Sequence, residues 1–566
     1  MPNRLPRILP GLLLTLALAC NLGTSATTQP AASPPPATEL NLTATPQHAE
    51  PTHSGLTSLD MTATASAGGE QHGGLTPLDM TATAGAGHGA TAHATSTPLP
   101  EAAFTPSATV SIQVDGATRY QTISGFGASF RPFNGPLSKL DTPNGPDFTT
   151  ATDEQRRAIA QILFSQLGLT RARVFPNGFE PVNDNADPFT FNPAAYDWSE
   201  VNQITDFIAL AKPDGLQTPW ASFSMDVGHT QAWLRKPGSD CALNPALIDE
   251  EVEWLLAAAI RFRDAGEELQ FMAVNNEPDL CPPGFKIEID DMVTIVKRLG
   301  ARLRAEGLST KIVVTDGWIP QNVLRYAQAV LADPDARQYV GALAYHAYAD
   351  GYDDPAAVLN NSAQGNPPHA AVEVRRQIRD LAAQYNLPVW MTEICYCVPR
   401  SGFSEFELLR ARLNHLHDEM TLANVAAFDA INLYNIRRPG VFDELVEVYY
   451  RPDGTMERYE LSTYGQLLGH YSRFVAPGSV RLKADSGDPR VRVLAYQRPD
   501  GKLVIVALNN NTFAVQANIG FANVSQPAAL SVLTSREDAI WQDGPEVSAG
   551  AMGVLPPLSV TTFVGK

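Results

Sequence analysis

The stretch 271-FMAVNNEPDL-280 starts as a short apolar segment and ends in two amides, a glutamate and a proline. Its first half has the length and composition of a buried strand. A carboxylate, Glu277, therefore follows directly on an apolar strand, between Asn276 and Pro278. The surrounding pattern indicates which fold places such a strand and such a carboxylate together.

From Ala108 onward, apolar segments of strand length alternate with amphipathic segments of helix length. The predicted strands are 122–130, 169–175, 218–225, 269–277, 311–316, 340–348, 387–393 and 426–435. The helix-length segments include 153–167, 250–266 and 370–385. Eight strands, each followed by a helical segment, predict a (β/α)8 TIM barrel of the α/β class over residues 119–466.

The pattern changes after about Tyr464 to short strands separated by turn residues, such as VRVLAYQ, RPDGK and LVIVALN. This pattern predicts a C-terminal antiparallel β-sandwich side domain over residues 467–566. The strand-like segment 108–118 precedes the barrel, and we expect it to pair into this side domain.

The N-terminal part of the chain is typical of an exported protein. Residues 1–20 carry two arginines, a short apolar run and Cys20, which predicts an export signal with a lipobox whose cysteine is lipidated. Ordinary cleavage after Ala19 is the alternative, so we expect a cell-surface lipoprotein, or a secreted protein if the lipobox is not used. Residues 21–107 are rich in Ala, Thr, Pro and Gly, which predicts a disordered linker containing a duplicated segment.

The net charge of −19 argues against a nucleic-acid partner, because binding to phosphates needs a basic surface. The only expected contact with a membrane is through the N-terminal lipid. The sequence contains no G-x-S-x-G turn, H-E-x-x-H zinc helix or G-x-x-x-x-G-K phosphate loop.

Two glutamates end predicted strands of the barrel. Glu277 ends the fourth strand, and Glu393 ends the seventh in LPVWMTE. Reactive groups of such barrels lie at the carboxyl ends of the strands, so the two carboxylates can face each other. Hydrolysis of a glycosidic bond needs one carboxylic acid and one carboxylate, about 5–5.5 Å apart if configuration is retained. We expect the charge of Glu393 to raise the pKa of Glu277, and hydrolysis by two carboxylates requires no cofactor and no metal.

Several separated motifs resemble glycoside hydrolase family 30, a family of retaining β-glycosidases on (β/α)8 barrels. They are YQTISGFGASF (120–130), NEP (276–278), AYHAY (344–348), MTE (391–393) and YGQLLGHYSRFVAPGSVRL (464–482). The resemblance runs from about residue 108 to residue 566. It implies a barrel with a side β-domain and hydrolysis of a β-linked polysaccharide or oligosaccharide.

The resemblance also implies roles for individual residues. Glu277 matches the acid/base and Glu393 the nucleophile, while Asn276 matches the residue that binds the sugar 2-hydroxyl. Arg173 matches the arginine that keeps the nucleophile ionised, although Arg171 has the same strand parity. Further contacts near the nucleophile are implied for His346 and Tyr348.

Aromatic residues near the strand ends are candidates for stacking on sugar rings. We expect this role for Trp318 after the fifth strand, for Tyr434 on the eighth, and for Trp220 on the third. The segment WASFSMDVGHTQAWLR (220–235) lacks the prolines common in the family at this place, so the substrate is open.

The sequence contains five cysteines, of which four follow Cys20. Disulfides are permitted in an exported protein, and four cysteines allow three full pairings. One option joins Cys241 to Cys281, with Cys395 and Cys397 as the remaining pair. A zinc site does not fit the C-x-C spacing.

The function predicted from these features is that of a retaining glycoside hydrolase that cleaves β-linked glycans by double displacement. Endo-acting β-1,6-glycanase and xylanase activities fit this prediction. The alternative is a non-catalytic surface glycan-binding lipoprotein, against which the intact pair Glu277 and Glu393 argues.

Overall fold

The computed structural model describes residues 104–130, 151–176, 192, 194–223, 232–281, 284–453, 455–548, 550 and 552–566. The predicted export signal, Cys20 and almost the whole predicted linker lie outside these residues, as does much of the segment 220–235. No helix in these ranges has the length and apolar character needed to cross a lipid bilayer.

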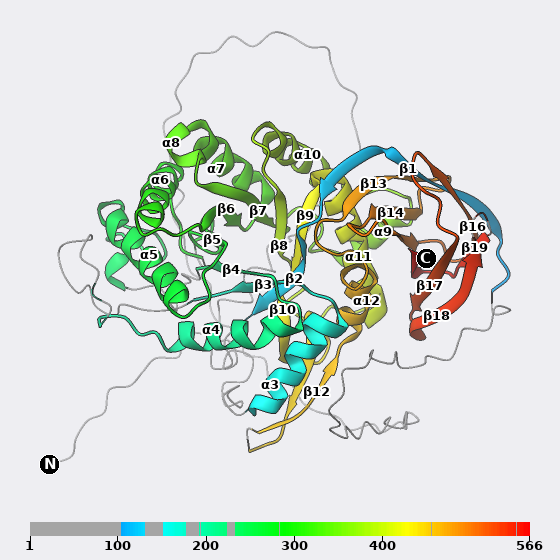
Figure 1. Ribbon diagram of the computed structural model, residues 1–566, viewed down its shortest axis with the longest axis horizontal. Coiled ribbons are helices and arrows are strands. Elements are labelled where there is room, and N and C mark those ends of the chain that lie inside the picture. Colours follow the sequence, from blue (N-terminus) through cyan, green and yellow to red (C-terminus); the bar gives the residue numbers. More distant parts are fainter. Residues whose placement is uncertain are drawn as a thin grey trace, which may run out of the picture. The chain divides into compact units, whose positions relative to one another are not determined.

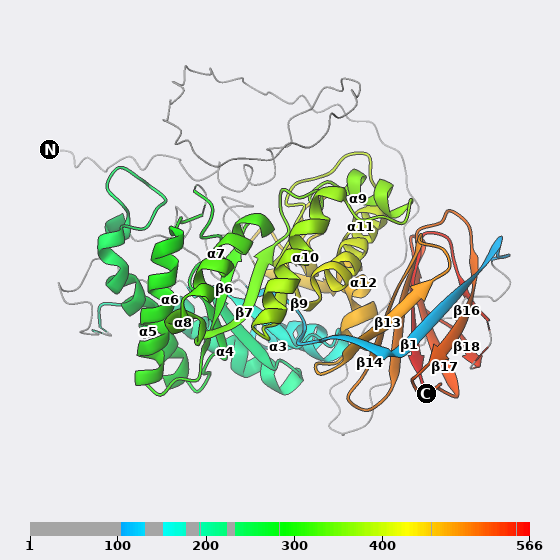
Figure 2. The same ribbon diagram turned by 90° about the horizontal axis from the view of Figure 1, so that it is seen from above.

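Eight parallel strands form a closed barrel, and all eight correspond to predicted strands (Figures 1 and 2). The barrel closes because β2 pairs with both β3 and β9. In chain order the strands are β2 (Gly125–Phe130), β3 (Arg171–Val174), β4 (Thr218–Ser222), β5 (Phe271–Ala273), β6 (Lys311–Gly317), β7 (Val340–His346), β8 (Val389–Glu393) and β9 (Val425–Ala430).

Helices surround the barrel, and their ends follow local sequence signals (Figure 1). Thr152 and Ser404 each begin a helix with a reciprocal capping box, in which the residue three positions later is Gln155 or Glu407. The helices are α3 (Asp153–Ala160), α4 (Ser199–Ala211), α5 (Ile248–Asp264), α6 (Ile289–Ala305), α7 (Pro320–Ala332), α8 (Pro334–Arg337), α9 (Pro355–Ser362), α10 (His369–Gln384), α11 (Glu405–Asp418) and α12 (Thr463–Ser472).

The side domain is a nine-stranded sheet in the order β18-β17-β20-β15-β14-β13-β1-β16-β19. A Cβ at Gly553 of β19 would lie 3.0 Å from the ring of Phe563 on β20, so strands distant in this order face each other across a core. The strands are β1 (Ala108–Thr122), β13 (Val480–Ser486), β14 (Val491–Gln497), β15 (Leu503–Asn509), β16 (Val515–Ala522), β17 (Ala529–Arg536), β18 (Ala539–Ser548), β19 (Met552–Leu555) and β20 (Ser559–Gly565).

The expectation that the segment before the barrel pairs into this domain is confirmed. Strand β1, blue in Figure 1, lies between β13 and β16 among the orange and red strands. Its pairing with β16 is parallel, which is a departure from the antiparallel arrangement that the other strand pairs of this sheet follow. Helix α12 crosses the boundary expected at residue 467, and the first sandwich strand after it begins at Val480.

The last predicted barrel strand, 426–435, is wrong in its extent. The chain leaves the barrel after β9 and continues as β10 (Asn432–Ile436), which belongs to a separate three-stranded sheet with β11 (Glu444–Tyr450) and β12 (Met456–Leu461). All of β9 and the first three residues of β10 are buried, so burial continues through the break between the two strands.

The barrel interior has its own small core, made of two tryptophans and a set of small residues. Trp220 and Trp390 fill it together with alanines from β5, β7 and β9. Their rings lie 5.6 Å apart between centroids. This filling closes the lower part of the barrel.

Candidate active site

Glu277 reaches the carboxyl end of the barrel from the loop after β5. The strand ends at Ala273, and Glu277 has a left-handed backbone with φ of 52°. Its backbone N–H donates to the carbonyl oxygen of Asp316, at a distance of 3.0 Å. The side chain is buried, with 8% of the residue exposed, so the loop holds the carboxyl group against the barrel and away from bulk water.

Glu393 is the last residue of β8, and both of its carboxylate oxygens are occupied. Arg173 Nη1 donates to Oε2 at 2.5 Å, and Tyr348 Oη donates to Oε1 at 3.1 Å. The β7–β8 register is irregular between Tyr345 and His346, which brings His346 opposite Glu393. The last residues of β7 and β8, His346 and Glu393, therefore lie next to each other.

The two glutamates are close together. One carboxylate oxygen of Glu277, one of Glu393 and a ring nitrogen of His346 all lie within 4.8 Å of one another. His346 Nδ1 is 2.9 Å from Glu277 Oε1 and 4.0 Å from Glu393 Oε1. The structure therefore brings together the pair predicted from strands four and seven.

Arg173 donates hydrogen bonds to several side chains of the site. Its Nη2 donates to Asp316 Oδ2 at 2.6 Å, to Ser222 Oγ at 3.3 Å and to the Asn276 side-chain oxygen. Burial would lower the pKa of Arg173, but Asp316 and Glu393 outweigh it and raise the pKa above its usual range. Arg171 instead pairs with Asp429 deeper in the barrel, so the structure favours Arg173 as the partner of Glu393.

His346 is wholly buried between carboxylates. Burial would lower its pKa, but the charges of Glu393 and Asp316, with hydrogen bonds to Asp316 and Glu277, raise the pKa of His346 to about 10. The raised pKa favours the cationic ring, whose Nδ1 lies 2.9 Å from Glu277 Oε1 and whose Nε2 lies 3.3 Å from Asp316 Oδ1 and 3.2 Å from Arg173 Nη2.

The pKa of Glu277 is raised, as expected, but charge repulsion is not the main cause. Burial contributes most, and the charges of Glu393 and Asp279 add to it, while the hydrogen bond and charge of His346 act in the opposite direction. Because Oε1 accepts the His346 proton, Oε2 is the atom of Glu277 that carries an acid proton.

Among the described residues, two groups of side chains have a spacing that would suit a metal ion. In Glu277, His346 and Glu393, the neighbouring carboxylates raise the pKa of His346, which favours a proton over a metal at its ring nitrogens. In Cys395, Cys397 and Asp443, the two sulfur atoms are joined in a disulfide and offer no thiolate to a metal.

Two predicted substrate contacts are wrong. Trp220 is 0% exposed, because its ring fills the barrel interior and its Nε1 donates to Asp429. Tyr434 lies on β10, outside the barrel sheet, and packs edge-on against Phe130 with 6% of the residue exposed. Burial raises the pKa of Tyr434 well above its usual range, and neither ring presents a face to a sugar.

Trp318 follows β6 and is partly exposed, so its predicted role stays a prediction. Its backbone N–H donates to Asp279 Oδ1 at 2.7 Å, and Asp279 Oδ2 accepts from the Asn322 side chain at 3.0 Å. Asp279 thereby fastens the loop after β6 to the loop that carries Glu277.

Asp316 is the functional-site residue that the sequence reasoning missed. It is the penultimate residue of β6, whereas Glu393 is the last of β8, and it accepts hydrogen bonds from Arg173 and Thr392 and lies 3.3 Å from His346 Nε2. Burial would raise the pKa of Asp316, but Arg173 and His346 hold it well below its usual range. The signal was available, because KIVVTD is also an apolar strand that ends in a carboxylate.

Two disulfides flank the glutamates. One joins Cys241 to Cys281, which confirms one of the three pairings considered, and Cys281 follows Glu277 by four residues. The other joins Cys395 to Cys397 in the segment directly after Glu393.

Comparison with known proteins supports this architecture. Residues 478–563 match the model of the glycosyl hydrolase family 30 beta sandwich domain. The glucuronoxylanase XynC of Bacillus subtilis (strain 168) is 28% identical over 295 residues, which cover 49% of this chain and 64% of that relative's length.

Two solved structures share the fold. A GH30 endoxylanase from Clostridium papyrosolvens C71 has a TM-score of 0.59 at 19% identity, covering 81% of this chain and 100% of that one. The endo-beta1,6-glucanase BT3312 has a TM-score of 0.54 at 18% identity, covering 80% and 93%. The family model covers the sandwich, and the solved structures share the fold of barrel and sandwich, so the chain is similar to proteins of glycoside hydrolase family 30.

Proposed function

We propose that this chain is a retaining glycoside hydrolase in which Glu277 is the acid/base and Glu393 the nucleophile. The observation that carries the proposal is the approach of one oxygen of each carboxylate to within 4.8 Å of the other at the ends of β5 and β8. Retaining enzymes hold the two groups about 5–5.5 Å apart, whereas inverting enzymes need about 6.5–9.5 Å to admit a water.

In the first step, Glu393 attacks the anomeric carbon while Glu277 gives its proton to the glycosidic oxygen. The bond to the leaving sugar breaks, and a glycosyl ester of Glu393 forms. The ion pair with Arg173 and the hydrogen bond from Tyr348 favour the charged form of Glu393 before this attack. Burial raises the pKa of Glu277 and so favours its protonated form.

In the second step, the ester leaves Glu393 without its charge, and Glu277, now ionised, takes a proton from water. The water oxygen bonds to the anomeric carbon and Glu393 departs as a carboxylate. The cationic ring of His346 stays hydrogen-bonded to Glu277 Oε1 and stabilises the ionised form.

Asn276 is oriented to bind the substrate. Its side-chain oxygen accepts from Arg173, so its amide N–H₂ is left as the group that donates to a sugar hydroxyl. This orientation supports the predicted contact with the 2-hydroxyl, where hydrogen bonds strengthen in the transition state.

For the substrate, we propose a β-linked polysaccharide, with xylan and β-1,6-glucan as the first candidates and endo action. The relative named glucuronoxylanase and the neighbour named endo-beta1,6-glucanase support this choice. We further propose that the chain is exported and anchored through Cys20. Replacing Cys20 with Ala in the expressing cell should move the protein from the membrane fraction to the medium.

The test is hydrolysis by the full chain of xylan, β-1,6-glucan, β-1,6-galactan and aryl β-glycosides, with Glu393→Gln as the matched control. A substrate cut by the wild type and not by the variant supports the proposal. Product lengths then separate endo from exo action.

The roles of the two glutamates are separated by rescue with azide. With an activated aryl β-glycoside, Glu393→Gly should yield an α-glycosyl azide, because azide takes the place of the missing nucleophile. Glu277→Ala should yield a β-glycosyl azide, because azide then attacks the glycosyl ester. A glycan that binds without being cut would overturn the proposal in favour of a surface glycan-binding protein.

A further inference from the structure

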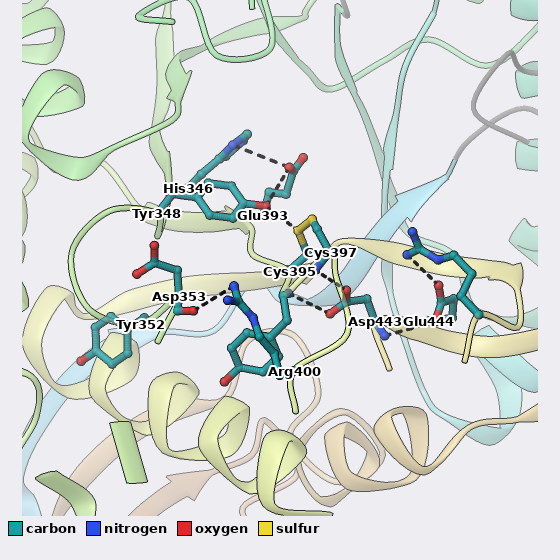
Figure 3. Close-up of a disulfide and its surroundings, with 12 residues drawn as sticks. His346, Tyr348, Tyr352, Asp353, Glu393, Cys395, Cys397, Arg400, Asp443 and Glu444 are labelled. Carbon is teal, nitrogen blue, oxygen red and sulfur yellow. Dashed lines mark hydrogen bonds and ion pairs between the residues drawn. A yellow bond between two sulfur atoms is a disulfide. The ribbon is translucent and has the colours of Figure 1, made fainter. Parts of the chain in front are cut away.

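Tyr348 lies between the predicted nucleophile and a disulfide. Its hydroxyl oxygen is 3.1 Å from Glu393 Oε1 and 3.2 Å from the sulfur of Cys395 (Figure 3). A tyrosine hydroxyl has a single proton, so Glu393 and Cys395 compete for it. The redox state of the cysteine pair decides how strong that competition is.

The segment that carries the disulfide is held from its other side by Asp443. The Asp443 carboxylate accepts the backbone N–H of Tyr396 at 3.1 Å and that of Cys397 at 2.9 Å. Asp443 is itself buried, and its backbone N–H donates to Glu444, which pairs with Arg438. The sulfur of Cys395 is therefore fixed next to the Tyr348 hydroxyl.

Chemistry distinguishes the two redox states. A disulfide sulfur is a weak acceptor without a proton, so the Tyr348 proton goes to the Glu393 carboxylate. A reduced Cys395 has a thiol whose ionised fraction rises with pH. The thiolate is a charged acceptor that draws the proton away from Glu393 and places a second negative charge beside it.

We propose that the Cys395–Cys397 disulfide is a positioning element for Glu393 that acts through the Tyr348 hydroxyl, and that reduction of this disulfide slows the reaction. This inference rests on the proposed function. In the reduction a dithiol transfers two electrons and two protons: the S–S bond breaks, two thiols form, and the dithiol becomes a cyclic disulfide. Cys397 is partly exposed whereas Cys395 is buried, so Cys397 provides the route of attack.

The experiment compares kcat and KM of the full chain before and after reduction by dithiothreitol, at pH 6.0 and at pH 8.5, with thiols counted by titration. We expect reduction to lower kcat roughly tenfold at pH 8.5, as for the loss of one hydrogen bond to a charged group, and less at pH 6.0, with little change in KM. The ionisation of Glu277 affects kcat in both forms of the enzyme. Its effect therefore cancels when the kcat of the reduced enzyme is divided by that of the oxidised enzyme at the same pH.

Three variants identify the cause. The variant Cys241→Ser/Cys281→Ser lacks the other disulfide and should show the same ratio as the wild type. Cys395→Ala/Cys397→Ala should not respond to the reductant. Tyr348→Phe should respond less than the wild type at pH 8.5, because only the charge of the thiolate then acts on Glu393, whereas a merely loosened loop would give both proteins the same response.

An oxidised wild type that hydrolyses its substrate and keeps its kcat on verified reduction would overturn the inference alone. An equal response of Tyr348→Phe and the wild type would also overturn it, because the effect would then bypass the hydroxyl. If the oxidised chain hydrolyses nothing in the panel, the proposed function fails and takes this inference with it.

Discussion

Arg171 and Arg173 are two residues apart on β3, both are wholly buried inside the barrel, and both contact carboxylates. Arg171 forms a closed pair, with Nε and Nη2 each 3.1 Å from an oxygen of Asp429. Its guanidinium lies 4.1 Å from the centroid of the Trp390 ring. Arg173 divides its donors among Glu393, Asp316 and Asn276.

The difference between the two arginines comes from their height in the barrel. Arg173 is about 6–7 Å nearer the carboxyl ends of the strands. Gly127 of β2 makes room for the lower pair, since a Cβ there would lie 2.6 Å from the Asp429 carboxylate. The same residue type therefore pairs with Asp429 at the lower level and with the proposed nucleophile Glu393 at the upper level.

The largest expected effect comes from neutralising Glu393, the carboxylate that pairs with Arg173 at the upper level. Glu393→Gln removes the nucleophile and should lower kcat by about 10⁴-fold or more, measured with an aryl β-glycoside. Asp429→Asn makes the same chemical change at the lower level and should leave most of kcat. Comparable losses in the two variants would show that the two levels do not differ in function.

Replacing each arginine with glutamine tests the difference between Arg171 and Arg173 directly. Arg173→Gln should lower kcat about 10²- to 10³-fold, as for the loss of a preorganised donor. Arg171→Gln leaves Asp429 buried and unpaired, and should lower the free energy of unfolding by about 3–5 kcal/mol while kcat is largely kept. Urea denaturation and steady-state kinetics on both variants provide the measurements, and a large loss of kcat in Arg171→Gln would contradict the assignment.

His470 on α12 extends the comparison to a buried group at the junction with the sandwich. It contacts Thr562 and Ser535, and burial lowers the pKa of His470 to about 3. An unfolded histidine takes up a proton below about pH 6.5, whereas the folded one stays neutral until about pH 3. Stability should therefore fall with acid by about 1.4 kcal/mol for each pH unit between 5.5 and 3.5.

His470→Gln removes this acid-dependent loss, so the stability difference between wild type and variant should change with pH over that range. The measurement is urea denaturation at several pH values. A constant difference would mean that the histidine is charged in the folded protein.

The smallest expected effect is that of His346, at the upper level, on the pH profile of kcat/KM. The hydrogen bond and charge of His346 lower the pKa of Glu277, so His346→Gln should raise that pKa further. The alkaline limb of kcat/KM should then move to higher pH, because Glu277 keeps its acid proton longer. His415→Gln, whose histidine contacts Glu419, is the control and should leave the limb in place.

Much of the fold was readable from the chain. The barrel strands were predicted because each is a short apolar run between amphipathic helices, and the error at residues 426–435 arose where β10 begins two residues after β9 without a turn signal such as Gly or Pro. Position at a strand end likewise identified Glu277 and Glu393, since parallel strands bring their carboxyl ends to one edge.

Only the tertiary structure shows which residues the two arginines and the two tryptophans contact. Arg171 and Arg173 have the same parity, and Trp220 and Trp318 lie on or directly after predicted strands, so local sequence could not assign one arginine to the site or one ring to the core. Depth in the barrel separates them, and depth depends on strand register across the whole sheet. The contact of Tyr348 with Cys395 likewise joins two strands, and a contact made by neighbouring elements has no signature in either segment by itself.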